Sequence, residues 1–507
     1  MKRVCIYTSL LLVSAAPLYP QIYVATDGSD TNAGTIDQPF ETIARAITIA
    51  IQGDTIYVRG GEYIHTNSIS IGSSKSGSDN ARYYLCAYPG ERPVLNFFLS
   101  SNGRKGINFQ ASYWHIKGLD IKGAGDNGIE IDGGSFNIIE YCSFFENRDS
   151  GMQLSNGAAN NQIINCDSYF NADPPDYGDA DGFAPKLAVG SGNYFYGCRA
   201  WGNCDDGWDG YMRGANDVTT TLENCWTWGN GYLKDGSDPG SQANGNGFKM
   251  GGGDNSNSLL LMHHFILKNC LAFQNKHKGF DQNNNVGSMT LLNCTGYANL
   301  EADYKIIRNL NAGQTLIVKN CVAFIGIVDL GSFAIQEKNG WMSPFVVAAD
   351  DFLSIDPSLA SSPRKADGSL PNIDFMHLAS GSDLIDAGVD LGIPFTGNAP
   401  DLGAFESGFT SAVEAEKLFP ADVRLDQNYP NPFNPETSIK FNLSRSSFAT
   451  LKIYNLIGQE IETLVNGFRA AGEYEIEWRP QGLASGLYFY RLRAGDFSET
   501  KKLVLQR

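Results

Sequence analysis

The chain has 507 residues, 42% of them hydrophobic and 12% aromatic, so it is long enough for one large domain or a few smaller ones with sizeable cores. Its formal net charge of −17 argues against a nucleic-acid partner, and it leaves an anionic polysaccharide as a partner only if a cation bridges the two. The 56 glycines and the scarcity of helix-favouring runs favour an all-β or solenoid chain over a helical one.

The first residues, MKRVCIYTSLLLVSAAPLYPQ, have a basic start, an apolar stretch and an end rich in small and turn-forming residues. This pattern is typical of a secretory signal peptide, which we assign to residues 1–20. No later run of the sequence is apolar for long enough to span a membrane. Cys5 belongs to the signal peptide, and the nine remaining cysteines would allow four disulfides in an exported protein.

A repeat of ten residues occupies the middle of the chain. Seven segments align without gaps, beginning with IIEYCSFFEN at residues 138–147, and an earlier segment at 114–123 fits with glycine in both key places. The tenth position is Asn in six of the seven segments. The fifth position is always cysteine: Cys142, Cys166, Cys198, Cys225, Cys270, Cys294 and Cys321. The eighth is always aromatic: Phe145, Tyr169, Trp201, Trp228, Phe273, Tyr297 and Phe324.

The spacing of these segments, near 24–27 residues with longer interruptions, fits one coil of a right-handed parallel β-helix. Coils stack about 4.8 Å apart, so equivalent residues form ladders along the solenoid. We expect the seven cysteines to be buried free thiols, because each belongs to a different coil. The asparagines should stack along a turn. For Trp201 and Trp228, stacking in the core is favoured over a role as sugar-binding platforms.

A second repeat follows each of these strands and aligns on a glycine. Its members are DNGIEI, DSGMQL, ADGFAP, DDGWDG, GNGFKM and HKGFDQ. The alignment places Asp181 on one coil, Asp205, Asp206 and Asp209 on the next, and Lys249 on the third, in the same column as Asp209. Carboxylates so close together repel one another unless a cation lies among them, and oxygen ligands in irregular geometry favour Ca²⁺. An Asp-Gly turn would explain one of these segments but not acids concentrated on two adjacent coils.

Two insertions lengthen the turns that lead into this region. The usual count from the cysteine to the next aligned glycine is nine, but it is 16 from Cys166 to Gly182 and 22 from Cys225 to Gly247. The insertions, ADPPDYGDA and GYLKDGSDPGSQAN, are expected to wall a cleft around the acids and the lysine. The glycines around Lys249 are expected to leave room for a sugar ring against the backbone.

The segments DADGFAPK, CDDGWDG and GNGFKMGGG resemble the family 9 polysaccharide lyases, which are pectate lyases on a right-handed β-helix, and the similarity extends over residues 22–407. The resemblance implies Ca²⁺ ligands at Asp181, Asp205, Asp206 and Asp209 and a catalytic base at Lys249. It also implies that galacturonate-containing polysaccharide is cleaved by β-elimination. Arg213 follows the acidic segment and is a candidate for binding a substrate carboxylate, although a plain surface arginine or one paired with a protein carboxylate is an equal expectation.

The composition changes near residue 411. A Pro- and Asn-rich segment is followed by five alternating strand patterns, which predict a small β-sandwich. YPNPFNPETSIKF, SGLYFYRL and the basic end KKLVLQR resemble the type A C-terminal sorting domains of the type IX secretion system, over residues 420–507. The resemblance implies passage through the periplasm and outer membrane, with attachment to the surface or release; the alternative is a carbohydrate-binding module.

These observations predict an all-β chain with four parts: a signal peptide (1–20), a parallel β-helix (21–410), a linker (411–424) and an immunoglobulin-like β-sandwich (425–507). Three functions remain open: a Ca²⁺-dependent pectate lyase, a rhamnogalacturonan lyase with the same mechanism, and a non-catalytic surface β-helix that binds polysaccharide. A binder would have no use for a base at Lys249. The expected partners are pectin and the secretion machinery, with no nucleic acid, and the protein is expected to be a monomer.

Overall fold

The computed structural model describes residues 21–214, 216–253, 260–408, 423–443, 447–456, 458–469, 472–480, 482–494 and 497–506. The predicted signal peptide and residues 411–422 of the predicted linker lie outside this part of the chain. The chain divides into two compact units. One holds the residues up to 349 together with 360–371 and 402–405, and the other holds 350–359, 372–401 and the residues from 406 onwards.

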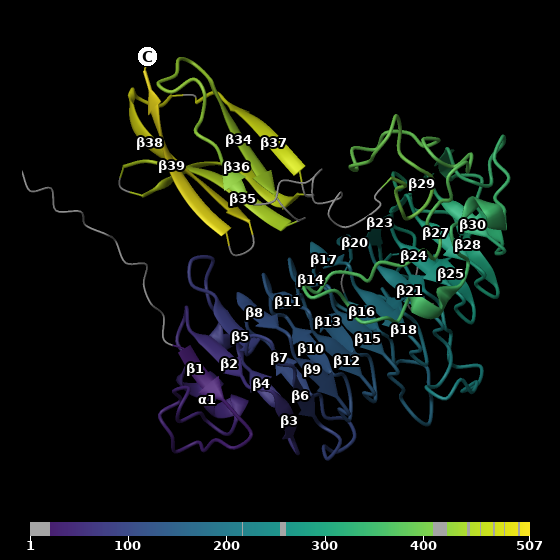
Figure 1. Cartoon of the computed structure of the whole chain (residues 1–507), viewed down its shortest axis with the longest axis horizontal. Helices are drawn as coiled ribbons and strands as arrows, with labels where there is room; N and C mark the ends of the chain where they lie inside the picture. The colour runs from purple at the N-terminus through teal and green to yellow at the C-terminus, as the bar shows by residue number, and fades with distance from the viewer. Residues whose placement is uncertain are drawn as a thin grey trace, which may run out of the picture. The chain divides into compact units, whose positions relative to one another are not determined.

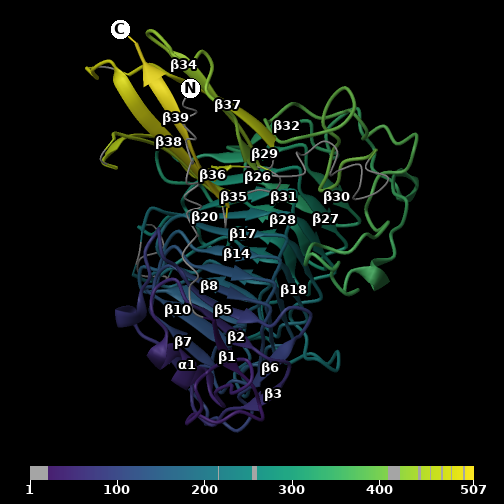
Figure 2. The same cartoon turned by 60° about the vertical axis from the view of Figure 1, so that its left-hand side comes forward.

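The first unit is a parallel β-helix of three long sheets, and successive coils can be followed by colour in Figure 1. Sheet 1 contains β1 (Gln21–Val24), β2 (Thr55–Val58), β5 (Tyr83–Ala87), β8 (Trp114–Lys117), β11 (Ile138–Glu140), β14 (Gln162–Ile164), β17 (Asn193–Tyr196), β20 (Val218–Glu223), β23 (His263–Lys268), β26 (Met289–Leu292), β29 (Leu316–Lys319) and β32 (Ile335–Glu337). In Figure 2 its strands β8, β14, β17 and β20 lie one above the other.

Sheets 2 and 3 complete each coil. Sheet 2 contains β4 (Ile69–Ile71), β7 (Ile107–Phe109), β10 (Ile129–Asp132), β13 (Met152–Ser155), β16 (Phe183–Pro185), β19 (Trp208–Asp209), β22 (Phe248–Lys249), β25 (Lys278–Asp281), β28 (Ala302–Ile306) and β31 (Val328–Leu330). Sheet 3 contains β3 (Gly61–Ile64), β6 (Pro93–Asn96), β9 (Asp120–Lys122), β12 (Ser143–Phe145), β15 (Asp167–Tyr169), β18 (Arg199–Trp201), β21 (Trp226–Trp228), β24 (Leu271–Phe273), β27 (Thr295–Tyr297) and β30 (Val322–Phe324). The predicted fold class is confirmed.

Helical structure is sparse. The α-helix α1 (Ile43–Ile49) is capped by Thr42, whose hydroxyl accepts a hydrogen bond from the amide of Arg45, and its apolar face contacts β1, β2 and β4. The short 3₁₀ helices are η1 (Ser73–Lys75), η2 (Ala349–Asp351) and η3 (Pro357–Leu359). Within the described ranges, no helix has the length and apolar character needed to cross a membrane.

Ladders of like residues hold the coils in register. All nine cysteines that the structure describes are free thiols, and the seven of the repeat are buried in the core, as predicted. The asparagines of the tenth position stack in the turn between sheets 3 and 2. The side-chain amide of Asn203 donates to Asn230 at 3.0 Å, and that of Asn230 donates to Asn275 at 2.8 Å. These buried asparagines satisfy backbone amides of adjacent coils as well, so they fix the spacing of the turn.

The aromatic column stacks as predicted, but Trp201 and Trp228 do not lie in the core. The indole rings of Trp201 and Trp228 are 4.9 Å apart and nearly parallel, yet both side chains remain partly exposed. In each strand the neighbouring residue, such as Ala200, points into the core, so the aromatic residue must point outwards. The prediction that these tryptophans stack in the core is therefore wrong. Phe273 and Tyr297 of the same column are buried.

In the second unit, the C-terminal residues form two antiparallel sheets. One contains β33 (Arg424–Leu425), β34 (Thr437–Leu443) and β37 (Gly472–Trp478); the other contains β36 (Glu460–Arg469), β35 (Ser447–Tyr454), β38 (Gly486–Ala494) and β39 (Phe497–Leu505). They share one apolar core that includes Ile439, Leu451 and Tyr490. A small antiparallel β domain at this end was predicted and is confirmed.

Candidate functional site

The predicted acidic cluster lies where sheet 3 turns into sheet 2 on two consecutive coils, and Lys249 lies on the third. Strand β16 pairs with β19, and β19 pairs with β22 in the register that sets Asp209 beside Lys249. This is the register expected from the aligned glycines. The side chains lie outside the apolar core, because Phe183, Trp208 and Phe248 occupy the inward positions of the same strands. All four aspartates and Lys249 are nevertheless buried, with Lys249 the most accessible at 9%.

Three of the four predicted ligands come together. One carboxylate oxygen from each of Asp181, Asp205 and Asp206 lies within 4.8 Å of the others. Backbone amides hold two of these carboxylates in place: Asn244 donates to Asp205 at 2.6 Å, and Asn246 donates to Asp206 at 2.7 Å. The segment at the end of the second insertion, which belongs to the next coil, therefore holds two carboxylates of the acidic cluster in place.

Asp209 lies beside this group and faces two lysines. Lys249 Nζ is 3.2 Å from Asp209 Oδ1 and 2.9 Å from Asp206 Oδ2. On the other side, Lys186 Nζ is 2.8 Å from Asp181 Oδ2 and 3.7 Å from Asp209 Oδ2. Each lysine thus joins two members of the acidic cluster.

Sequence reasoning missed Lys186. The residue stands in the segment DADGFAPK, which carried the family resemblance, but no role was assigned to it. The available signal was the strand alternation, because Lys186 is two residues beyond Ala184 and therefore extends from the same side of β16. It is 6% exposed and paired with two acids, so it belongs to the site as much as Lys249 does.

Burial and mutual repulsion dominate the electrostatics of the cluster. Burial raises the pKa of Asp181 well above its usual value, against the opposing effect of Lys186, and burial and Asp206 together raise the pKa of Asp205. Burial alone would lower the pKa of Lys249. The surrounding aspartates, first Asp206 and then Asp209, outweigh it, and the pKa of Lys249 lies well above its usual value.

The donor set fits a divalent cation. When all four carboxylates are ionised, they outnumber the two ammonium groups of Lys186 and Lys249, so the buried cluster carries a net negative charge. Closely spaced carboxylate oxygens are ligands for a hard cation, and irregular geometry suits calcium better than magnesium. A cation held by Asp181, Asp205 and Asp206 would favour their ionised forms, against the burial and mutual repulsion that raise their pKa values.

The expected role of the glycines is wrong. A Cβ atom at Gly247 would lie 2.7 Å from the carbonyl oxygen of Gly279, and one at Gly252 would lie 2.6 Å from the side-chain nitrogen of Asn283. The space beside these glycines is occupied by the next coil and not by a ligand. They permit close stacking of the coils behind Lys249.

The other predicted features lie around the cluster. Arg213 is exposed, with its guanidinium 5.4 Å from the ring centre of Tyr211 and its backbone amide hydrogen-bonded to the carbonyl oxygen of Leu187.

The two insertions approach each other, since a Cβ atom at Gly178 would be 3.4 Å from the carbonyl oxygen of Gln242. They line a groove of about 850 Å³, but neither the aspartates nor Lys249 line it. The cleft that they form lies beside the acids and not around them.

Comparison with known proteins identifies the family. Residues 22–324 match the model described as "Pel9A-like, right handed beta helix region". The chain belongs to this family. A pectate lyase L of Paenibacillus polymyxa is 39% identical over 394 residues, covering 73% of this chain and 84% of the relative. The crystal structure of pectate lyase Pel9A matches with a TM-score of 0.70 and 35% identity, over 76% of this chain and 96% of that one.

A rhamnogalacturonan lyase structure is more distant from this Pel9A-like chain. It matches with a TM-score of 0.62 and 25% identity, over 71% of this chain and 96% of that one. Membership of the family makes the protein an enzyme of the pectate lyase type, which disfavours the non-catalytic surface β-helix.

The C-terminal part of the chain has a separate function. Residues 427–506 match the secretion system C-terminal sorting domain, as the sequence motifs predicted. Such a domain is the address that type IX secretion reads, so the protein is delivered to the cell surface or beyond it. The alternative prediction of a carbohydrate-binding module is not favoured.

Proposed function

We propose that this protein cleaves polygalacturonate in pectin by Ca²⁺-dependent β-elimination, with Lys249 as the base. The observation that carries the proposal is the pairing of Lys249 with Asp206 and Asp209 at the edge of a buried carboxylate cluster. The named relatives are pectate lyases, which agrees with this substrate class.

Asp181, Asp205 and Asp206 would hold the calcium ion, with Asp209 beside them. A bound Ca²⁺ supplies charge neutralisation at the uronate carboxylate, which makes the neighbouring C5 proton more acidic. The aspartates raise the pKa of Lys249, and a cation held by their carboxylates would lower it towards the neutral amine that can accept a proton.

The elimination transfers one proton to Lys249 and breaks one glycosidic bond. Lys249 Nζ takes the C5 proton, and the electrons of the C5–H bond form the C4–C5 double bond. The C4–O4 bond breaks, and O4 of the leaving sugar chain takes up a proton from solvent water. Lys186 stays paired with Asp181 on the far side of the cluster and keeps that carboxylate oriented. Arg213 remains a candidate for holding a substrate carboxylate.

The test is the appearance of unsaturated uronate, followed by absorbance at about 235 nm, on polygalacturonate and on rhamnogalacturonan. We expect Ca²⁺-dependent product from polygalacturonate. Product from rhamnogalacturonan alone would assign the protein to the alternative substrate with the same chemistry. No product from either polymer, with Ca²⁺ present, would contradict the proposal.

A further inference from the structure

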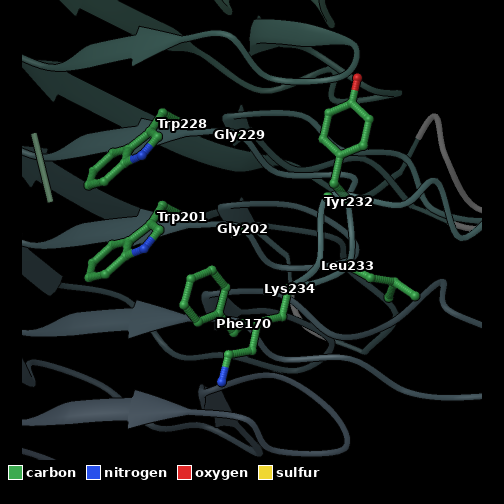
Figure 3. Close-up of a pocket in the computed structure, with 9 residues that line it drawn as sticks. Phe170, Trp201, Gly202, Trp228, Gly229, Tyr232, Leu233 and Lys234 are labelled. Atoms are coloured by element: carbon green, nitrogen blue, oxygen red, sulfur yellow. The ribbon is translucent and has the colours of Figure 1, made fainter. Parts of the chain in front are cut away.

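The two insertions and the turns of three earlier coils line a groove of about 850 Å³, which we call the insertion groove. Its lining includes Phe98, Arg148, Phe170, Tyr177 and Lys234. A smaller pocket of about 310 Å³ adjoins it and shares Phe170, Leu233 and Lys234 with it. Figure 3 shows this pocket, with Trp201 and Trp228 stacked on one side and Tyr232 and Leu233 of the second insertion on the other.

Short segments of the chain connect residues of the insertion groove with the acidic cluster. Arg148 is two residues before Ser150, whose hydroxyl lies 3.1 Å from Asp181 Oδ2. In the first insertion, the carboxylate of Asp173 accepts hydrogen bonds from the amides of residues 178–180, which lead directly into Asp181. The second insertion ends at Asn244, which bonds Asp205. A polymer seated at the acidic cluster therefore has this groove beside it.

Arg148 gives the insertion groove a cation that is available to an anionic ligand. Its side chain is exposed, and within the described part of the chain its one hydrogen bond goes to Asn102, at 2.5 Å. Lys234 is different, because its ammonium is paired with Glu146. In a chain of net charge −17, an exposed guanidinium with no carboxylate partner in the described structure is suited to a carboxylate ligand, which it binds through two parallel N–H groups.

The groove also offers aromatic surface. Phe98 is 79% exposed. Trp201 and Trp228 cover each other at 4.9 Å, and Tyr169 and Phe273 stack on their other faces, so only ring edges are left for a ligand. An aromatic face packs against the C–H face of a pyranose ring, and a large exposed apolar side chain in a groove marks a binding site. A sugar ring that carries a carboxylate combines both requirements.

We propose that the insertion groove binds the part of the galacturonan chain that extends beyond the cleaved bond, with Arg148 holding a uronate carboxylate and Phe98 packing against a sugar ring. The inference rests on the proposed function, because the occupant is the same polymer. It predicts that long substrates bind through contacts that short ones cannot reach.

The experiment measures Kd in the Lys249→Ala background with Ca²⁺ present, using long polygalacturonate and galacturonate trimer. The test variants are Arg148→Gln and Phe98→Ala. The matched control is Arg104→Gln, since Arg104 is also exposed and bonded to an asparagine, Asn67, but does not line the groove. Thermal melting of each variant checks that the fold is kept.

We expect Arg148→Gln and Phe98→Ala each to weaken binding of the long polymer about tenfold, with less than a twofold change for the trimer and no change in Arg104→Gln. In the active enzyme, KM for the polymer should rise while kcat stays within twofold. Equal Kd values for polymer in all variants would overturn the proposal, and so would an equal loss on the trimer. If the wild-type protein shows no elimination, the proposed function fails, but the polymer Kd values still decide the role of the groove.

Discussion

Lys249 and Asp209 are direct cross-strand partners on neighbouring coils, with 3.2 Å between Nζ and Oδ1. The stacking of the coils alone brings the two side chains together, because strand pairing aligns the second residue after each repeat glycine. Asp209, which lies beside the proposed calcium ligands, and the proposed base Lys249 are thus positioned by the same hydrogen-bonded ladder.

Calcium removal should abolish activity, and Asp206→Ala should weaken calcium binding. Asp206 accepts a hydrogen bond from Asn246 and forms an ion pair with Lys249, and its carboxylate lies close to those of Asp181 and Asp205. Its loss therefore removes contacts to several members of the cluster. We expect at least a tenfold higher Kd for Ca²⁺ by calorimetry, with Asp217→Ala, an exposed acid outside the cluster, unchanged. Full activity in excess EDTA would contradict the prediction.

Lys249→Ala should lower turnover by about 10²–10⁴-fold while calcium and polymer still bind, because the proton acceptor is lost. Lys249→Arg should fail as well, since a guanidinium stays protonated. Lys278→Ala is the matched control: this lysine is on the next coil and pairs with Asp281 outside the cluster. Turnover above a tenth of wild type in Lys249→Ala would show that another group accepts the proton.

Lys186→Met should destabilise the β-helix in EDTA, because it leaves Asp181 buried with fewer partners. Removing one member of a buried ion pair costs about 3–5 kcal/mol. Adding Ca²⁺ should restore part of this loss, because the cation replaces the missing positive charge. Urea unfolding with and without Ca²⁺ measures both effects, and equal stability of variant and wild type in EDTA would refute the prediction.

The seven cysteines of the ladder should be inert in the native protein and fully reactive after unfolding. Burial raises the pKa of thiols such as Cys166 and Cys225 well above the usual value, so neither access nor thiolate is available in the fold. Alkylation without reductant, followed by mass spectrometry, should label none of the seven before denaturation and all of them after it. Two or more ladder cysteines joined by disulfides would be inconsistent with this arrangement.

The buried Glu140 should make the free energy of unfolding depend on pH in the acid range. Burial would raise its pKa, but the hydrogen bond with His115 at 2.8 Å and the ammonium of Lys117 lower it from 4.5 to about 2. A lowered pKa means that the stabilisation, roughly 3 kcal/mol, is complete above about pH 4.5 and is lost as the pH falls through about 2.

The test of this pair compares Glu140→Gln with wild type by urea unfolding at pH 7 and pH 3. We expect the difference in unfolding free energy to shrink by about half at pH 3. The exposed Glu41→Gln serves as the control, with little effect at either pH. A difference that is the same at both pH values would argue against the lowered pKa.

The repeat made most of the β-helix predictable, because one cysteine and one asparagine per coil report the register directly. The aligned glycines likewise predicted that Asp209 and Lys249 would be neighbours. The outward position of Trp201 was missed because a column of repeated aromatic residues predicts stacking but not the side of the strand on which the side chains lie. The true contacts of Gly247 and the pairing of Lys186 depend on atoms of adjacent coils, which no single segment contains.

The thiol ladder has a consequence for how the protein is made. A chain that is exported carries its cysteines through compartments where disulfides form, and while it is unfolded each thiol is accessible to oxidants and to its neighbours. Once the coils close, burial in the core keeps oxidants away from the same thiols. Folding and thiol oxidation therefore compete kinetically. A coil that forms quickly protects its own cysteine and presents a template on which the next coil can close.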